Sequence, residues 1–289
     1  MQVRFWGTRG SIPKPGPATL RHGGNTSCLE VVTGSGALIV LDAGTGAHDL
    51  GHALTERLGP KMRGHLLITH THWDHIQGLP FFAPLWMAGG EWDIYAPRDA
   101  GHTLREILSA QMQAPFFPVK LADMRATIRF HALEEGRFEI EGVRVQAQML
   151  HHAAPTLGYR LEADGAAVVY ACDHEPFDPG LAGGLGQVRG ADARHADFLA
   201  GADLVVHDAQ YTAAEYPGHA GWGHGTHEYA ARMAALAGVG TVAMTHHDPN
   251  RSDAALDVAM AGLQAGPFGE AGVRLVAAAE GDVFELGRV

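Results

Sequence analysis

Short runs of apolar residues recur along the chain, and each ends at a histidine or an aspartate. Six such runs are strand-like and lie at residues 37–46, 65–75, 143–152, 165–175, 202–212 and 238–249. Their length and composition are typical of strands that are buried in a sheet. Ligand sites of α/β sheets lie at the carboxyl ends of the strands, so we expect the terminal histidines and aspartates to converge on one rim.

Four other stretches have helical periodicity or are rich in alanine. They are predicted to be helices and lie at residues 48–59, 98–113, 226–239 and 252–266; the last two have a polar start and a glycine stop. Strands mixed with helices predict an α/β fold. The glycine-rich segment 178–193 is expected to be a surface loop, not a linker, so residues 1–289 are expected to form a single domain.

The densest group of candidate metal ligands is THTHWDHIQG, residues 69–78. His70 and His72 are two residues apart and therefore share one side of an extended chain, where they can bind one ion. Asp74 and His75 follow a bend and can bind a second ion beside the first. Imidazole and carboxylate are good ligands of zinc and similar divalent ions. Ligands to complete the two sites can come from the other strand ends, at His152, Asp173 and His246.

Composition and charge narrow the class of protein. The 289 residues are 46% hydrophobic and 18% charged, which is typical of globular proteins. No apolar run approaches the ~18 residues of a membrane span, and the first residues do not resemble a signal peptide. The net charge is −11 without a basic block, so we expect no long nucleic acid as partner but allow a small, anionic substrate.

Cysteine and histidine contents set two further expectations. Cys28 and Cys172 suggest neither a disulfide framework nor a cysteine zinc site, so a reducing, cytoplasmic setting is expected. With 19 histidines in the chain, isolated ones carry little information, and we interpret seven as ordinary surface or core residues: His48, His52, His65, His102, His131, His195 and His219.

Two aromatic, proline-rich segments, 79–90 and 113–119, fit two alternatives. They can belong to the core, or they can form a pocket wall or the surface of a homodimer. The sequence leaves both alternatives open.

Several of these segments, taken in order, resemble the metallo-β-lactamase superfamily. The string T-H-x-H-x-D-H-x-x-G at 69–78 is similar to its signature, LDAGTG to its early Asp-Gly turn, YACDHE to its bridging-aspartate strand and MTHHDP to its last-histidine strand. HAAPTLGYR and GWGHGT resemble segments of the ribonuclease Z and phosphodiesterase branch, with Gly225 where serine is usual. The resemblance covers most of the chain and implies an αββα four-layer sandwich with a dinuclear metal site at one edge.

The resemblance also implies which residues bind the ions. One ion would be held by His70, His72 and His152, the other by Asp74, His75 and His246, with Asp173 shared. The six-residue step to Gly158 favours His152 over His151, and the position directly after Thr245 favours His246 over His247. Two Zn²⁺ ions are the default, although nitrogen and oxygen ligands also suit manganese or iron.

Further residues receive roles through the same resemblance. Asp42 would orient a ligand imidazole. Asp74 would orient a metal-bridging hydroxide for attack on phosphorus. His224 would be a general acid near the scissile phosphate, oriented by Asp208. In the alternative interpretation, His224 only caps the helix that follows it.

The implied activity is that of a metal-dependent hydrolase. GYR, DAQYT and GHGT resemble the phosphodiesterase branch, and no long basic arm for tRNA is found, so we expect a small or cyclic phosphodiester as substrate. Two alternatives stay open: a thioesterase or lactonase similar to glyoxalase II, and a non-hydrolytic metal-binding or redox module. The first is less favoured because H-x-P-G-H is missing at His152. The second is less favoured because 289 residues leave no room for a flavodoxin-like partner domain.

Overall fold

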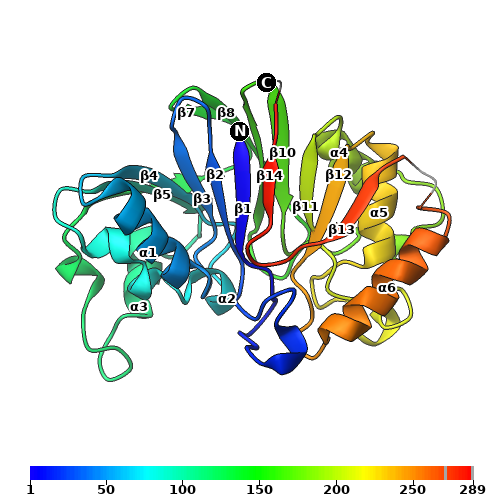
Figure 1. Cartoon of the computed structure of the whole chain (residues 1–289), viewed down its shortest axis with the longest axis horizontal. Helices are drawn as coiled ribbons and strands as arrows, with labels where there is room; N and C mark the ends of the chain where they lie inside the picture. Colours follow the sequence, from blue (N-terminus) through cyan, green and yellow to red (C-terminus); the bar gives the residue numbers. More distant parts are fainter. Residues whose placement is uncertain (270–271, 288–289) are drawn as a thin grey trace.

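Two mixed β-sheets pack face to face, and helices cover both outer faces (Figure 1). The computed structural model describes residues 1–269 and 272–287. In these residues the first sheet has the order β14-β1-β2-β3-β4-β5-β6 and the second the order β13-β12-β11-β10-β9-β8-β7. The four layers confirm the αββα arrangement expected from the sequence.

The strands of the first sheet are β1 (Gln2–Gly7), β2 (Cys28–Val32), β3 (Leu38–Leu41), β4 (Arg63–Leu67), β5 (Glu91–Pro97), β6 (Thr127–Leu133) and β14 (Val283–Glu285). Those of the second are β7 (Gly136–Ile140), β8 (Val143–Met149), β9 (Leu157–Ala163), β10 (Ala166–Ala171), β11 (Leu204–Asp208), β12 (Thr241–Thr245) and β13 (Arg274–Ala277). Strands β3 to β6 run parallel to one another, as do β10 to β13.

Three helices lie beside each sheet or at its rim. The first half contains α1 (Ala47–Leu58), α2 (Trp73–Ile76) and α3 (Leu104–Ala110), and the second half contains α4 (Gly190–Leu199), α5 (His227–Leu236) and α6 (Asp253–Ala265). Short 3-10 helices occupy Pro17–Thr19, Leu79–Phe81, Ala83–Trp86, Leu121–Asp123, Pro179–Leu181 and Tyr216–Gly218. None of the described helices is long and apolar enough to cross a membrane.

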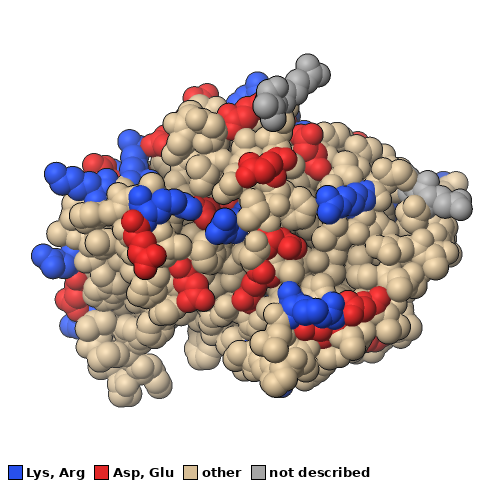
Figure 2. All heavy atoms as spheres, viewed as in Figure 1, with Lys and Arg blue, Asp and Glu red and all other residues tan. Residues whose placement is uncertain are grey.

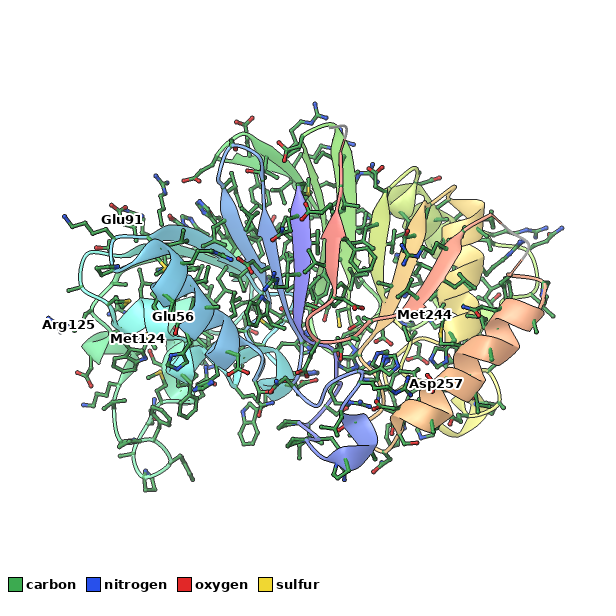
Figure 3. The ribbon with its side chains drawn as sticks, in the orientation of Figure 1. Glu56, Glu91, Met124, Arg125, Met244 and Asp257 are labelled. Atoms are coloured by element: carbon green, nitrogen blue, oxygen red, sulfur yellow. The ribbon has the colours of Figure 1, made fainter. Side chains whose placement is uncertain are left out.

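Apolar side chains fill three core regions. The central one lies between the sheets, where Ile39 and Leu41 share a cluster with Leu161 and Val168. Each sheet also packs against its own helices: Met124 belongs to the outer core of the first half and Met244, on β12, to that of the second, and both are labelled in Figure 3. Burial on both faces explains why the parallel strands are apolar almost throughout.

Each of the six strand-like runs of the sequence overlaps one strand, in order β3, β4, β8, β10, β11 and β12, so the prediction of six strands is confirmed, although β4 begins two residues before its run. The helix predicted at 98–113 is shorter, because Thr103 caps it with a side-chain oxygen that accepts from the N–H of Glu106. Helix α4 was not predicted and begins inside the glycine-rich segment 178–193. Its N-terminus lacks a side-chain cap, so the sequence carries no start signal there.

Candidate metal centre

The predicted metal ligands converge at one edge of the two sheets. The bend after β4 places four of them, and the segments after β8, β10 and β12 place one each: His70, His72, Asp74, His75, His152, Asp173 and His246. Because parallel strands end at the same rim, ligands from distant parts of the sequence meet there.

Three of the strand-end residues have left-handed backbone conformations. The φ angles are 60° at Asp42, 61° at Asp173 and 60° at His246, and Ser11 beside the site has 63°. Such conformations are unfavourable for residues other than glycine and persist only where the surrounding structure enforces them. Here they turn the chain sharply at the end of β3, β10 and β12, directly where each side chain enters the site.

A first group of ligand atoms surrounds one oxygen of Asp173. Nε2 of His152 lies 3.2 Å from Nδ1 of His72. Nε2 of His70 and Nε2 of His152 each lie 3.6 Å from Oδ2 of Asp173. These atoms belong to four residues whose possible ligand atoms lie close together, and they are the four that the resemblance implied for the first ion.

A second group surrounds the other oxygen of the same carboxylate. Oδ1 of Asp173 lies 3.0 Å from Nε2 of His75 and 3.3 Å from Nε2 of His246. Oδ2 of Asp74 completes the group at 3.1 Å from Nε2 of His246. Asp173 thus turns one oxygen toward each group, which is the arrangement of a bridging ligand.

The chemistry of these atoms fits two divalent cations. In the described part of the chain, Nε2 of His70, Nε2 of His75 and Oδ1 of Asp173 are buried without a hydrogen-bond partner. Polar atoms buried in this way are unfavourable unless something else binds them. Burial also lowers the pKa of His70 and of His152, which favours the neutral rings that metal ligands must be.

Hydrogen bonds on the far side of the ring fix three of the candidate ligand histidines. Nδ1 of His75 donates to Oδ2 of Asp42 over 2.8 Å, and Nδ1 of His152 donates to the carbonyl oxygen of Gly223 over 2.8 Å. Nδ1 of His246 donates to Oε1 of Gln210 over 2.9 Å. Each bond leaves the lone pair of Nε2 directed into the site.

Asp42 is itself held by four donor groups, one of which is the hydroxyl of Thr69 at 3.0 Å. It accepts from the backbone N–H of Thr69 over 2.7 Å and from the hydroxyl of Tyr170 over 2.9 Å, in addition to the bond from His75. The structure therefore places Asp42 where the sequence analysis expected a residue that orients a ligand imidazole.

The two ambiguous histidine pairs have different surroundings. His151 turns away from the centre: Nδ1 lies 3.2 Å from the carbonyl oxygen of Glu175, and the ring stacks on Phe177. His247 donates from Nε2 to the carbonyl oxygen of Ala278 over 2.9 Å and is buried there. His152 and His246 therefore face the other candidate ligands, and these are the two residues that the resemblance favours.

His224 forms a close pair with Asp208 beside the first group. Nδ1 of His224 lies 2.8 Å from Oδ2 of Asp208. Burial lowers the pKa of this imidazole, but the charge of Asp208 outweighs burial and raises the pKa to about 9. The capping alternative is wrong, because Thr226 caps α5 with its side chain.

The sequence analysis missed two residues that organise the site. One is Gln210, which holds His246. The other is Glu175, whose carboxylate accepts from the hydroxyl of Tyr216 and from the backbone N–H groups of Gly221 and Gly223. Glu175 thereby fastens the loop that presents Gly223 to His152. Both lie within two residues of a strand-end aspartate, which is a signal that sequence reasoning could have used.

His207, which also lies at the end of a predicted strand, is outside the metal centre. His207 is adjacent to Asp208 on β11, so its side chain points to the opposite face of the sheet. There Nε2 of His207 lies 2.9 Å from Nε2 of His195, and the ring of His174 stacks on His195 with 3.8 Å between centroids. The seven histidines interpreted as ordinary residues lie outside the metal centre, at the surface or in the core.

Comparisons with known proteins identify a family and several relatives. A family model described as the beta-lactamase superfamily domain matches residues 38–247. A ribonuclease Z of Mycobacterium marinum is 28% identical over 266 residues, which are 86% of this chain and 87% of that protein. A ribonuclease Z of Staphylococcus carnosus is 30% identical over 169 residues. The matched region is 56% of this chain and 50% of that relative, so the chain spans about half the length of the relative.

Solved structures show the same fold. The metallo-beta-lactamase fold protein YhfI from Bacillus subtilis has a TM-score of 0.69 at 18% identity. The match covers 98% of this chain and 98% of YhfI. The short form of human tRNase Z has a TM-score of 0.65 at 20% identity, with 99% of both chains covered. The family match and the relatives named ribonuclease Z confirm the predicted enzyme class, a metal-dependent hydrolase. Because this family model matches most of its length, the chain belongs to the beta-lactamase superfamily.

Proposed function

We propose that this protein is a phosphodiesterase that holds two divalent ions, Zn²⁺ by default, and hydrolyses a small or cyclic phosphodiester. The observation that carries the proposal is the position of Asp173, with one oxygen in each ligand group, beside the His224–Asp208 pair. The ligand residues come from both sheets, which supports the expectation that residues 1–289 act as one domain.

Two divalent ions supply positive charge that activates water and stabilises the attacking and leaving oxygens of a phosphodiester. Their proposed holders are the seven residues listed for the metal centre. The residues of the chain have separate tasks around them. Oδ2 of Asp74 accepts a hydrogen bond of 2.8 Å from the backbone N–H of Ser11, which fixes the carboxylate. In this position it can orient the attacking water.

His224 is proposed to protonate the departing oxygen. Its Nδ1–H is bound to Asp208, so Nε2–H is free to donate. Asp208 is in turn fixed by the backbone N–H groups of Gln210 and Gly225, which donate to its Oδ1 over 3.0 and 3.1 Å. The carboxylate therefore keeps the imidazole oriented while its charge favours the protonated ring.

A small substrate fits the charge of the protein better than tRNA does. One open pocket lies over the site, and its lining contains no lysine or arginine within the described residues: Ser11, Thr71, His72, Trp73, Asp74, Asp173 and His224. Figure 2 shows blue basic residues scattered among red acidic ones on the visible face, without one basic patch. A protein that binds a long nucleic acid needs such a patch.

The names of the relatives point toward RNA instead, so the test must include it. Metal-loaded protein would be assayed on an aryl phosphodiester, a cyclic nucleotide, a tRNA precursor, a glutathione thioester and a lactone. We expect hydrolysis of small diesters with little cleavage of the other classes. Faster turnover of the thioester than of every diester would contradict the proposal, and efficient cleavage of the tRNA precursor would contradict the small substrate.

Metal content is measured separately. Elemental analysis after reconstitution and dialysis should give about two ions per chain, because seven ligands exceed one tetrahedral site. One ion per chain, or none, would contradict the dinuclear proposal whatever the substrate.

A further inference from the structure

An uncharged hollow lies directly beside the open pocket. Its volume is about 520 Å³, and aromatic and aliphatic side chains dominate its lining, chiefly Trp73, Phe81, Ile107, Phe116 and Phe117. None of the described residues that line it carries a charge. We call this region the aromatic hollow.

Three of its aromatic residues are largely in contact with solvent. Trp73 is 77% exposed, Phe81 55% and Phe116 87%. Phe81 and Phe117 meet edge to face, with ring centroids 5.6 Å apart. A group of exposed aromatic side chains that rims one hollow is typical of a binding surface, whereas single exposed apolar residues are common.

The hollow is continuous with the metal centre. Thr71 and Trp73 line both the hollow and the open pocket, and both belong to the signature segment that carries His70 and His72. Figure 1 shows α2 and the loop after α3 at the same lower edge, and the lower left tip in Figure 2 is free of red and blue. A group attached to a phosphate in the open pocket can therefore extend into the hollow.

We propose that the aromatic hollow binds a flat, apolar aryl ring carried by the phosphodiester substrate. This inference rests on the proposed function. His224 lines the open pocket and is proposed to protonate the leaving group, so the ring in the hollow belongs to the ester group that stays on phosphorus. The substrate is thus a diester in which this retained group is aromatic.

The lining also excludes other occupants of this subsite. A second phosphate or another charged group would lose its hydration without finding a partner, which is unfavourable. An aromatic ring keeps its contacts, because edge-to-face and stacked arrangements with Trp73 and Phe116 are favourable. The hollow therefore selects for one ring next to one phosphate, and against a chain of successive phosphates.

A matched pair of substrates tests the inference. Phenyl 4-nitrophenyl phosphate and methyl 4-nitrophenyl phosphate share a leaving group and differ only in the retained group. We expect the wild-type protein to have the higher kcat/KM on the phenyl diester. Phe116→Ala should lower the phenyl-to-methyl ratio about three- to tenfold. Val258→Ala on α6 is the control, because Val258 is 74% exposed and outside the hollow, and it should keep the wild-type ratio.

A binding measurement separates this inference from the proposed function. Calorimetry on metal-loaded protein would compare phenylphosphonate with methylphosphonate, which carry the same charged group. If no diester is hydrolysed but the phenyl compound binds more tightly, and Phe116→Ala removes the difference, the hollow is confirmed and the proposed function is wrong. Equal phenyl-to-methyl ratios in wild type and Phe116→Ala, in both measurements, would overturn the inference.

The same variant distinguishes the hollow from a dimer surface. Sedimentation would compare wild-type protein with Phe116→Ala and Phe81→Ala. An unchanged oligomeric state supports a ligand subsite. A wild-type dimer that becomes monomeric in either variant would show that these aromatic residues pair with a second copy, and would overturn the inference.

Discussion

Nδ1 of His224 lies 2.8 Å from Oδ2 of Asp208, and this contact determines which nitrogen of the imidazole is free. Asp208 stands at the end of β11 and His224 in the loop before α5, so the pair joins two elements at the same edge as the ligands. The carboxylate binds one ring nitrogen, so Nε2 of the imidazole is the nitrogen that our proposal assigns to the departing oxygen.

Loss of His224 should therefore slow the reaction without loss of metal. General acid catalysis is typically worth about 10²–10⁴-fold, so His224→Ala should lower kcat on an alkyl phosphodiester by a factor in this range. Asp208→Asn should lower it by less, because the ring stays in place. Stopped assays together with elemental analysis would check both quantities.

The choice of leaving group provides the control for that prediction. An acidic nitrophenolate leaves without needing a proton, so the defect of His224→Ala should shrink on an aryl diester. Near-normal turnover of the alkyl diester by a fully metal-loaded His224→Ala protein would rule out the role of general acid.

The activity should also have an alkaline limit that depends on Asp208. Burial lowers the pKa of His224, but the charge of Asp208 raises it to about 9. Because the protonated ring is the donor, kcat should be retained below this pKa and lost as the pH rises through it. Asp208→Asn removes the raising charge and should move the alkaline limb to lower pH. Profiles of kcat against pH would show the shift, and an unmoved limb would argue that another group sets it.

The histidine pair at 151 and 152 should respond unequally to mutation. His152→Ala removes a side chain that faces His72 and Asp173, so the protein should lose metal on dialysis. His151→Ala removes a ring that stacks on Phe177 and should keep the wild-type stoichiometry. Elemental analysis of the two dialysed variants compares them directly. Greater loss from His151→Ala would reverse the assignment.

Two glycines provide a test of the loop that holds His152. A Cβ atom at Gly223 would lie 2.2 Å from Nδ1 of His152, whereas one at Gly221 would meet nothing within 4 Å. Their φ angles are similar, 87° and 85°, so alanine strains the backbone alike at both. Gly223→Ala should displace His152 and weaken metal binding about 10- to 100-fold. Gly221→Ala should lower stability only.

Metal titrations followed by calorimetry, with thermal unfolding as a second measurement, would compare the two glycine variants. Equal metal affinities would show that the hydrogen bond from His152 to Gly223 does not position this ligand.

Much of the ligand set could be read from the sequence, because the ligands follow local signals. An apolar run that ends in a histidine or aspartate predicts both a buried strand and a residue at its rim, as at β4, β10 and β12. The two-residue step between His70 and His72 then predicts that these rings face the same way. Asp42 also belongs to this local pattern, at the end of β3.

Other features depend on contacts between distant segments. The resemblance favoured one histidine of each pair, but the contacts that hold the other away from the site, with the carbonyl oxygens of Glu175 and Ala278, could not be read from the sequence. Helix α4 has no side-chain cap at its N-terminus, so the sequence contains no signal for its start. The alternation of side chains along β11 sends His207 to the opposite face from Asp208, although the sequence grouped them.

The sequence by itself thus determined the order of the strands that carry candidate ligands and the chemical nature of these side chains, because both are encoded within a few residues of each strand end. Only the tertiary structure decided how those side chains are held, through Gln210, Glu175 and Gly223, and that the aromatic residues 81 and 116 rim one hollow beside Trp73. The physical reason is that hydrogen bonds and pockets form between segments whose relative positions are set by packing of the whole core.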